Sequence, residues 1–487
     1  MKLRRDRAGF FLPRAEKTGF RTTWDWKLYL LLEEQPRDTS RLWLSNGLKP
    51  SSRARPSFHA DASEYVTAFD HTLNPMKILF TVQGDGRGHM TQAIAAAQIL
   101  EQHGHEIVAV TVGENPSRTI PEFFRRRFED RLSPIASPGF SFQAGKGVAT
   151  LATLRQAFWG RKQYRASLDT LGGLITRTAP DLIINFLEPL TGLFNLLHRH
   201  RVPVLSVGHQ FMLGHPDFVQ CPKFRLQQWT MRKYVQLAGA RSTRLALSFY
   251  PAAAIPEKGV FVIPPLLRSE VYALAPEDPG RFLLAYLLNQ GYKDEILRWH
   301  TANPGIELHC FCEKPEVEPV WRYDSTLSFH KIDGSKFLRM MAESRGVACT
   351  AGFESLNEAA WLGKPLLVVP VANHVEQYLN ALDAQKAGLA TAASSFDLSP
   401  LLSRHPAGNR EAYRRWLLQA GPTLLAFVDK TTRKESRIFA PAGSGPGSPA
   451  TAGDSRQFPR LLEGSSPGKS GGTPAPVVST REAVSHC

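Results

Sequence analysis

Short, continuously apolar segments alternate with helical segments twice along this chain of 487 residues, and that alternation constrains the fold more than any other feature. Continuous Val, Ile and Leu runs are typical of parallel strands covered on both faces, and a strand–helix repeat is typical of a doubly wound sheet. The first series predicts a helix at 91–103 and strands at 77–83, 106–111, 180–185 and 203–207. The second predicts strands at 281–288, 306–312, 347–350 and 365–370, with helices at 294–301, 336–343, 355–362 and 375–387. We therefore expect an α/β protein with two doubly wound domains, whose carboxyl strand ends face a common cleft.

Composition and proline placement divide the chain into parts. Prolines interrupt any regular element between 250 and 265, which indicates a boundary there. The stretch 440–480 is dominated by Gly, Ser, Pro and Ala, a composition that cannot offset the entropy of ordering. Met76 stands directly before the first predicted strand, and one hypothesis is that it is the biological start. The predicted parts are a disordered extension at 1–75, a first domain at 76–250, a second domain at 251–402 and a disordered, low-complexity tail at 403–487.

The net charge of +15 is unevenly distributed, which argues against a nucleic-acid-binding protein. Residues 76–245 carry 21 Lys and Arg against 11 Asp and Glu, whereas residues 246–402 carry 13 against 18. A DNA-binding protein usually concentrates its basic residues on one compact module with a recognisable motif. The longest apolar runs fall short of the ~18 residues that a membrane span needs, and no secretory signal is recognisable. Five cysteines without CxxC spacing predict buried free thiols in a reducing compartment, so we expect a cytoplasmic protein.

A basic cluster in the first half has two interpretations. Basic side chains beside aromatic ones can dock a protein peripherally on an anionic membrane surface, or they can form an ordinary solvated face. We favour the solvated face. The residues concerned are Arg125, Arg126, Arg127, Arg131, Arg161, Lys162 and Arg165, near Phe123, Phe124, Phe158 and Trp159.

The strongest functional signal is the segment TAGFESLNEAA at 350–360, followed by GKP at 363–365 and EQYLNA at 376–381. Gly352 lets the backbone approach a ligand after a strand, and Ser355 is placed to cap the helix that follows. The N-terminus of that helix offers free N–H groups and a positive dipole end, which suits a diphosphate. Glu358 can accept hydrogen bonds from a ribose diol, and Glu376 with Gln377 can bind vicinal sugar hydroxyls. The alternative is that Ser355 and Glu358 are only a helix cap and a surface acid.

A glycine-rich turn, GDGRGH at 84–89, follows the first predicted strand. A dinucleotide fingerprint of the form GxGxxG would need glycine at 89, where this chain has His89. No Gly-Lys-Ser/Thr follows, so the turn is not a phosphate-binding P-loop of the Walker type either.

These segments together resemble GT-B glycosyltransferases of families 1 and 28, both the UDP-glucuronosyl/glucosyltransferases and the N-acetylglucosaminyltransferase of lipid II synthesis. Their donor signature has a glycine turn, Ser or Thr, Glu three residues later, Gly-x-Pro, and an acidic residue or Gln followed by Gln and Asn-Ala, all of which occur here in order. The resemblance covers residues 76 to about 402 and departs at Thr350, where many plant-type members have histidine. It implies two Rossmann-like domains facing a cleft. It also implies inverting transfer of a sugar from a nucleotide diphosphate sugar, most simply a UDP-sugar, without a metal or other cofactor.

The resemblance also assigns candidate site residues. His89 takes the place of the general base, with phosphate binding or acceptor orientation as the alternative. Apart from the resemblance, Glu188 and His209 follow the ends of two other strands, where they can orient His89 or the acceptor. For each of them we favour the alternative, a structural role. The loop on the acceptor side contains Gly84, Gly86 and Gly88. The expected donor-binding residues are Asn289, Ile332, Gly352, Phe353, Ser355, Glu358, Glu376, Gln377 and Asn380.

Two other functions fit the same sequence. One is an enzyme like the UDP-N-acetylhexosamine 2-epimerases, and the other is a sugar-nucleotide-binding scaffold subunit without turnover. The acceptor stays open between a lipid, a glycan and a small molecule, because fold does not fix the acceptor.

Overall fold

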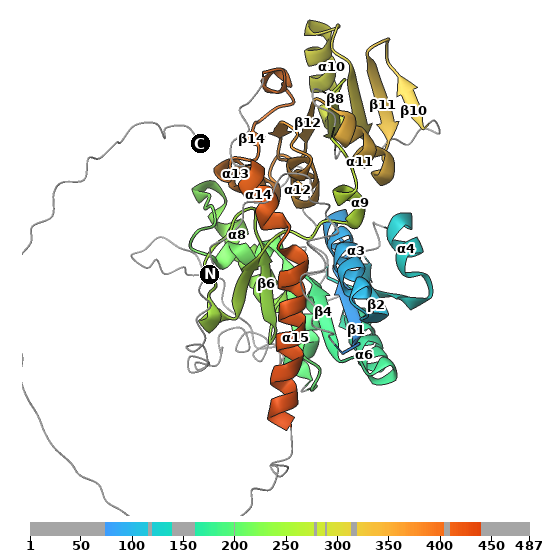
Figure 1. The fold of residues 1–487 in the computed structure, drawn as a ribbon, viewed down its shortest axis with the longest axis vertical. Coiled ribbons are helices and arrows are strands. Elements are labelled where there is room, and N and C mark those ends of the chain that lie inside the picture. Colours follow the sequence, from blue (N-terminus) through green and yellow to red (C-terminus); the bar gives the residue numbers. More distant parts are fainter. Residues whose placement is uncertain are drawn as a thin grey trace, which may run out of the picture.

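The computed structural model describes residues 74–114, 119–138, 161–198, 200–276, 280–287, 290–312, 319–403 and 410–439. Two seven-stranded sheets, each accompanied by helices, form its body (Figure 1). The expectations for residues 1–73 and 440–487 lie outside the described residues.

The first sheet is parallel throughout its described pairs and has the order β3-β2-β1-β4-β5-β6-β7. Its strands are β1 (Lys77–Val82), β2 (Glu106–Glu114), β3 (Leu132–Ala136), β4 (Leu182–Phe186), β5 (Val204–Gly208), β6 (Thr243–Leu247) and β7 (Val260–Ile263). The helices between them are α3 (Arg87–Gln102), α4 (Glu122–Phe128), α6 (Arg161–Thr178), α7 (Pro189–Leu197) and α8 (Arg225–Ala238).

The second sheet has the order β10-β11-β9-β8-β12-β13-β14 and is parallel except for the antiparallel pair of β10 and β11. Its strands are β8 (Leu283–Leu287), β9 (Leu308–Cys312), β10 (Val320–Arg322), β11 (Leu327–Lys331), β12 (Gly346–Cys349), β13 (Leu366–Val368) and β14 (Thr391–Ala392). Its helices are α9 (Ser269–Tyr272), α10 (Lys293–Ala302), α11 (Gly334–Glu343), α12 (Phe353–Trp361) and α13 (Val375–Lys386).

Both sheets are doubly wound, as the strand–helix alternation predicts. The strand order reverses between β1 and β4 in the first sheet and between β8 and β12 in the second. Ligands of such sheets bind outside the carboxyl strand ends at the reversal point. The glycine-rich turn follows β1 and the 350–360 segment follows β12, so both motifs stand where this rule places a ligand.

The first sheet extends further along the chain than the predicted boundary at 250. Strand β7 pairs with β6, so the last strand of the first sheet comes after that boundary. Prolines 256, 264 and 265 flank this four-residue strand, and their density hid it in the sequence.

Two helices occupy the beginning of the segment that we expected to be a low-complexity tail. They are α14 (Arg410–Leu417) and α15 (Ala420–Phe439). Tyr413, Leu417, Leu424 and Val428 are buried, and the spacing of four within each pair places the two side chains on one helix face. Helix α15 contacts α3, β5 and β7 and runs along the first sheet (Figure 1), although it follows the second sheet in sequence.

One hydrophobic cluster spans both sheets. It contains Phe80 and Phe186 of the first sheet, whose ring centroids lie 5.1 Å apart, together with Leu284 and Val347 of the second. Phe353 joins the same cluster at the start of α12. The two domains therefore share a core.

Cys221, Cys310, Cys312 and Cys349 are free and buried, as predicted for these four; Cys487 lies outside the described residues. None of the helices in the described ranges combines the length and the apolar character that a bilayer crossing requires.

Candidate active site

The glycine-rich turn after β1 brings α3 close to two neighbouring elements. A Cβ at Gly84 would lie 1.7 Å from the carbonyl oxygen of Gly113, at the end of β2, so only glycine fits there. Gly86 is the extended residue before α3. A Cβ at Gly88 would lie 3.5 Å from the Cγ of Glu354 on α12. The turn therefore allows the first turn of α3 to meet the first turn of α12.

His89 lies in the first turn of α3 and is 8% exposed. The helix begins at Arg87, four residues earlier than predicted, because extended Gly86 serves as its N-cap. Desolvation lowers the pKa of His89, while the carboxylates of Glu376 and Asp85 and a contact with Gln92 oppose that shift. The ring is therefore neutral at pH 7 and able to accept a proton.

Glu188 is fully buried at the N-terminus of α7. Its Oε1 accepts hydrogen bonds from the Ser137 hydroxyl at 2.6 Å and from the backbone N–H of Leu190 at 3.0 Å. Its Oε2 is buried without a hydrogen-bond partner. Burial raises the pKa of Glu188 to about 7 against these hydrogen bonds. Among the described residues, His89 contacts Gln92 rather than Glu188, so the geometry gives Glu188 a capping role and a titratable proton.

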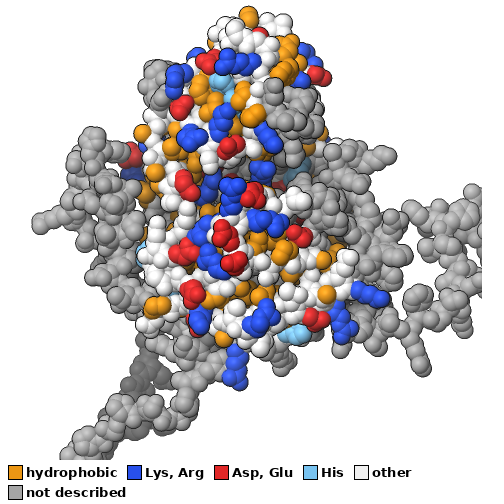
Figure 2. Space-filling view, turned by 90° about the vertical axis from the view of Figure 1, so that its right-hand side faces the viewer, with side chains coloured by type: hydrophobic (Ala, Val, Ile, Leu, Met, Phe, Trp, Pro, Cys, Tyr) orange, Lys and Arg blue, Asp and Glu red, His pale blue; other side chains and the backbone are white. Residues whose placement is uncertain are grey.

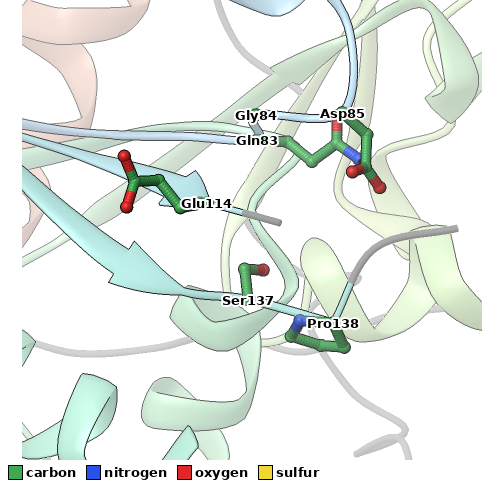
Figure 3. Close-up of a pocket in the computed structure, with 7 residues that line it drawn as sticks. Gln83, Gly84, Asp85, Glu114, Ser137 and Pro138 are labelled. Carbon is green, nitrogen blue, oxygen red and sulfur yellow. The ribbon is translucent and has the colours of Figure 1, made fainter. Parts of the chain in front are cut away.

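A shallow hollow lies at the carboxyl edge of β1, β2 and β3. Figure 3 shows the carboxylates of Asp85 and Glu114 on opposite sides of it and Ser137 beneath them. Ser137 connects this hollow to Glu188, because its hydroxyl donates to that buried carboxyl group. The hollow is a polar recess beside the turn that carries His89.

Helix α12 begins at Phe353, so the prediction that Ser355 caps it is wrong. Gly352 adopts the extended cap conformation, and no side chain caps the helix. Ser355 is the third residue of α12 and is half-buried. A glycine cap leaves the N–H groups of the first turn without a side-chain acceptor, an arrangement that suits an anion.

Glu358 is buried and held by an arginine. The Nη2 atom of Arg268 donates to its Oε1 at 2.6 Å, and the two side chains are 18% and 6% exposed. Arg268 lies between β7 and α9, in the segment that joins the two sheets. Glu358 is therefore not a surface acid: it connects α12 to the interdomain segment. Its expected contact with a ribose stays a prediction.

Glu354 is a candidate that the sequence reasoning missed. It is 8% exposed, its Oε1 accepts a hydrogen bond of 2.7 Å from Nε2 of Gln92, and its Oε2 has no hydrogen-bond partner. Burial and the neighbouring Glu358 raise its pKa to about 8, while Gln92 and Arg268 oppose the shift. The signal in the sequence was the position of an acid in the first turn of a largely apolar helix, where a polar side chain must find a partner.

The EQYLNA segment lies in α13, and its polar side chains form hydrogen bonds to several loops at the carboxyl edge of the sheets. Glu376 accepts a hydrogen bond of 2.8 Å from Gln210 of the first domain. Gln377 accepts one of 2.9 Å from the backbone N–H of Val371, and Asn380 donates one of 3.1 Å to the carbonyl of Ala351. These amides fix the loops after β13 and β12.

His209 follows β5 and lies at the interface of the two domains. Its Nδ1 lies 2.7 Å from the carbonyl oxygen of Leu247, and its ring stacks on Phe353 with centroids 4.1 Å apart. Burial lowers its pKa, so the neutral ring donates through Nδ1 to that carbonyl. Its Nε2 is buried without a partner. His209 thus anchors Phe353, the first residue of α12.

Of the two remaining donor candidates, the structure describes only one. Ile332 is half-buried in the loop between β11 and α11, as predicted. Asn289 lies outside the described residues.

The basic cluster around α4 is partly paired with acidic side chains. Arg127 and Arg131 both bind Glu101, Arg126 pairs with Glu122 at 2.7 Å, and Phe124 is fully buried. Figure 2, which faces the side of the molecule carrying α4, shows basic and acidic side chains intermixed. Phe158 and Trp159 lie outside the described residues. The arrangement favours the solvated face.

Within the described ranges, His, Cys, Asp and Glu side chains form no group of three that could hold a metal ion.

Comparison with known proteins gives consistent matches. A family model described as Glycosyl transferase family 1 matches residues 76–404. An uncharacterized glycosyltransferase of Methanosarcina acetivorans is 26% identical over 346 residues, 64% of this chain and 82% of that protein.

Two solved structures share the architecture. The glycotransferase of kitacinnamycin matches with a TM-score of 0.53 at 16% identity, over 74% of this chain and 100% of that one. Phytolacca americana UGT2, complexed with UDP-2fluoro-glucose and pterostilbene, matches with a TM-score of 0.51 at 14% identity, over the same shares. At these identities the two structures show a common fold.

Proposed function

The chain belongs to glycosyl transferase family 1 and is a glycosyltransferase with the two-domain GT-B fold, and from that premise we propose that it transfers a sugar from a UDP-sugar to an acceptor hydroxyl, with inversion and without a metal ion. The observation that carries the proposal is the meeting of the first turns of α3 and α12, each at the strand-order reversal of its own sheet. One helix presents His89, and the other presents an uncapped N-terminus.

The second domain is the proposed donor side. The free N–H groups and dipole of α12 would stabilise the diphosphate, whose negative charge grows as the sugar leaves. Glu358 and Glu376 would bind hydroxyl groups of the ribose and the sugar, and the loop at Ile332 would contact the base. A UDP donor is supported by Phytolacca americana UGT2, a protein of the same fold that is complexed with UDP-2fluoro-glucose.

The first domain is the proposed acceptor side, and His89 is its proposed general base. The acceptor oxygen forms a bond to the anomeric carbon while its proton passes to the imidazole. The bond between that carbon and the diphosphate oxygen breaks, and UDP leaves with the electron pair. Attack from the face opposite the leaving group inverts the anomeric centre. A positioned general base contributes ~10²–10⁴ in rate.

The experiment is calorimetric titration of the full chain with UDP in the presence of EDTA, with GDP, dTDP and NAD as controls. We expect selective binding of UDP. Screening UDP-sugars against lipid, glycan and small-molecule acceptors then separates the functions by their products. Free UDP with a glycoside supports the proposal, whereas an epimerised UDP-sugar or binding without turnover overturns it.

We also propose the cytoplasm as the place of action. The four buried free thiols support a reducing compartment. The proposal is tested by fractionation of cells that produce the chain, with membrane-bound or secreted protein as the contrary result.

A further inference from the structure

We propose that Gln92 and Glu354 are positioning residues that fix the tautomer of His89 across the domain interface, so that Nε2 of the ring is left free to receive a proton. The chemical use of that nitrogen rests on the proposed function, but the hydrogen-bond arrangement does not.

A chain of polar contacts connects the two domains at this point. Nδ1 of His89 lies 3.3 Å from Oε1 of Gln92, and Nε2 of Gln92 donates to Oε1 of Glu354 at 2.7 Å. The three residues are 8%, 2% and 8% exposed, respectively, so solvent exchange with these groups is limited. The first turns of the two helices lie against each other here, since a Cβ at Gly88 would be in van der Waals contact with the Cγ of Glu354 at 3.5 Å.

The donor and acceptor properties of each group determine the direction of these hydrogen bonds. An ionised carboxylate only accepts, so Gln92 turns its NH₂ group toward Glu354 and its carbonyl oxygen toward His89. A carbonyl oxygen also only accepts, so the proton of the neutral ring resides on Nδ1. The lone pair is then on Nε2. With the amide reversed, its N–H would donate to Nδ1, and the ring proton would block Nε2.

Glu354 controls the arrangement through its own protonation. A protonated carboxyl group can donate to the carbonyl oxygen of a reversed amide, whereas the ionised group cannot. Burial, opposed by Gln92 and Arg268 and assisted by Glu358, places the pKa of Glu354 at about 8. On the other side, Glu376 and Asp85 face His89. The Nδ1–H form of His89 is therefore expected to dominate above pH 8.

A second glutamine on α3 provides a matched control. Nε2 of Gln98 donates to Glu270 at 3.1 Å, and its Oε1 accepts from the backbone N–H of Ser269 at 2.9 Å. It makes the same kind of contact between α3 and the interdomain segment, but it lies more than two turns away from His89.

The test is long-range ¹H–¹⁵N NMR of the full chain labelled with ¹⁵N-histidine, at pH 9. The signals of His89 are identified by their loss in His89→Ala. In the wild type we expect the Nδ1–H tautomer. Gln92→Leu should convert most of His89 to the Nε2–H tautomer that dominates in free imidazole side chains. Gln98→Leu should leave the wild-type spectrum. Glu354→Gln, whose amide can donate as well as accept, lacks the acceptor-only carboxylate and should populate both tautomers. Glu354→Leu should lose the Nδ1–H preference as well.

An unchanged His89 tautomer in Gln92→Leu would overturn the proposal, as would an equal change in Gln98→Leu. UDP titration of the same variants reports on the donor site separately. A wild type that fails to bind UDP contradicts the proposed function and leaves the NMR result intact.

Discussion

Glu188 and Glu354 are buried carboxyl groups that follow the carboxyl ends of β4 and β12, and each has one oxygen without a hydrogen-bond partner. A buried carboxyl with a raised pKa is neutral when folded under conditions where it would be ionised when unfolded. Such groups make the free energy of unfolding depend on pH in the direction opposite to a salt-bridged acid.

For Glu188, the direction of the pH dependence of stability follows from a folded pKa of about 7 against an ordinary value of 4.5. Between these values Glu188 binds more protons in the folded chain than in the unfolded one. Its contribution to stability is therefore fully present below pH 4.5 and is lost as pH rises through 7. The loss is about 3 kcal/mol. Glu188→Gln keeps the acceptor for Ser137 and should lack this loss. Urea unfolding of both proteins at pH 5 and 8.5 measures the difference, and parallel declines would contradict the assignment.

The proposed role of His89 as the general base gives a kinetic prediction. His89→Ala should bind UDP with unchanged affinity and transfer sugar ~10²–10⁴ times more slowly, because only proton removal is lost. Calorimetry and product assays measure the two properties. Equal transfer rates in the variant and the wild type would exclude His89 as the base.

Glu358 gives the complementary prediction. Glu358→Ala should weaken UDP binding about tenfold, because a ribose would lose a charged acceptor and Arg268 its partner at 2.6 Å. Unchanged affinity would leave Glu358 with the structural role alone.

At the scale of elements, α15 supports a sheet to which it is not adjacent in sequence. Leu424 is fully buried in the shared cluster, whereas Lys430 on the same helix is exposed. Leu424→Ala should lower the free energy of unfolding by ~2–5 kcal/mol, and Lys430→Ala by less than ~0.5 kcal/mol. Thermal unfolding of the two variants gives the comparison. Similar stabilities would mean that α15 is dispensable.

The sequence predicted strands and motif positions well because these depend on local patterns. Uniformly apolar runs identified eight of the fourteen described strands, and Gly84 marked the close approach to β2. The six that were not predicted, β3, β6, β7, β10, β11 and β14, are short or contain polar residues. The starts of helices were harder to predict from the sequence, because Gly352 rather than Ser355 adopts the cap conformation. Hydrogen-bond partners across the domain interface could not be predicted from the sequence. Gln92 and Glu354 are 262 residues apart, and only the assembled fold brings them together. Helix α15 was missed because the Gly421-Pro422 pair in its first turn resembled the tail.

At the scale of the whole molecule, the two domains share one hydrophobic cluster and several polar contacts. Tyr250 donates to Asp383 at 2.6 Å, and the indole of Trp416 donates to the carbonyl of Ser248 at 2.9 Å. Residues that share one core unfold together. The domains should therefore behave as one cooperative unit.

Scanning calorimetry tests this cooperativity. The wild type should show one transition. Phe353→Ala removes the ring that stacks on His209 and packs on Phe249, and it should separate the transition into two. Phe329→Ala, inside the second sheet's own cluster, should lower the transition temperature without separating it. Two transitions in the wild type would contradict a shared core.

The path of α15 also has a consequence for synthesis on the ribosome. Strand β7, the last strand of the first sheet, ends at Ile263, but the helix that packs on β5 and β7 is complete only at Phe439. At ~5–20 residues per second, the nascent first sheet waits on the order of ten seconds with that apolar surface uncovered. The domain that is translated first is therefore finished last, and its exposed strands are a natural target for chaperones that bind emerging chains.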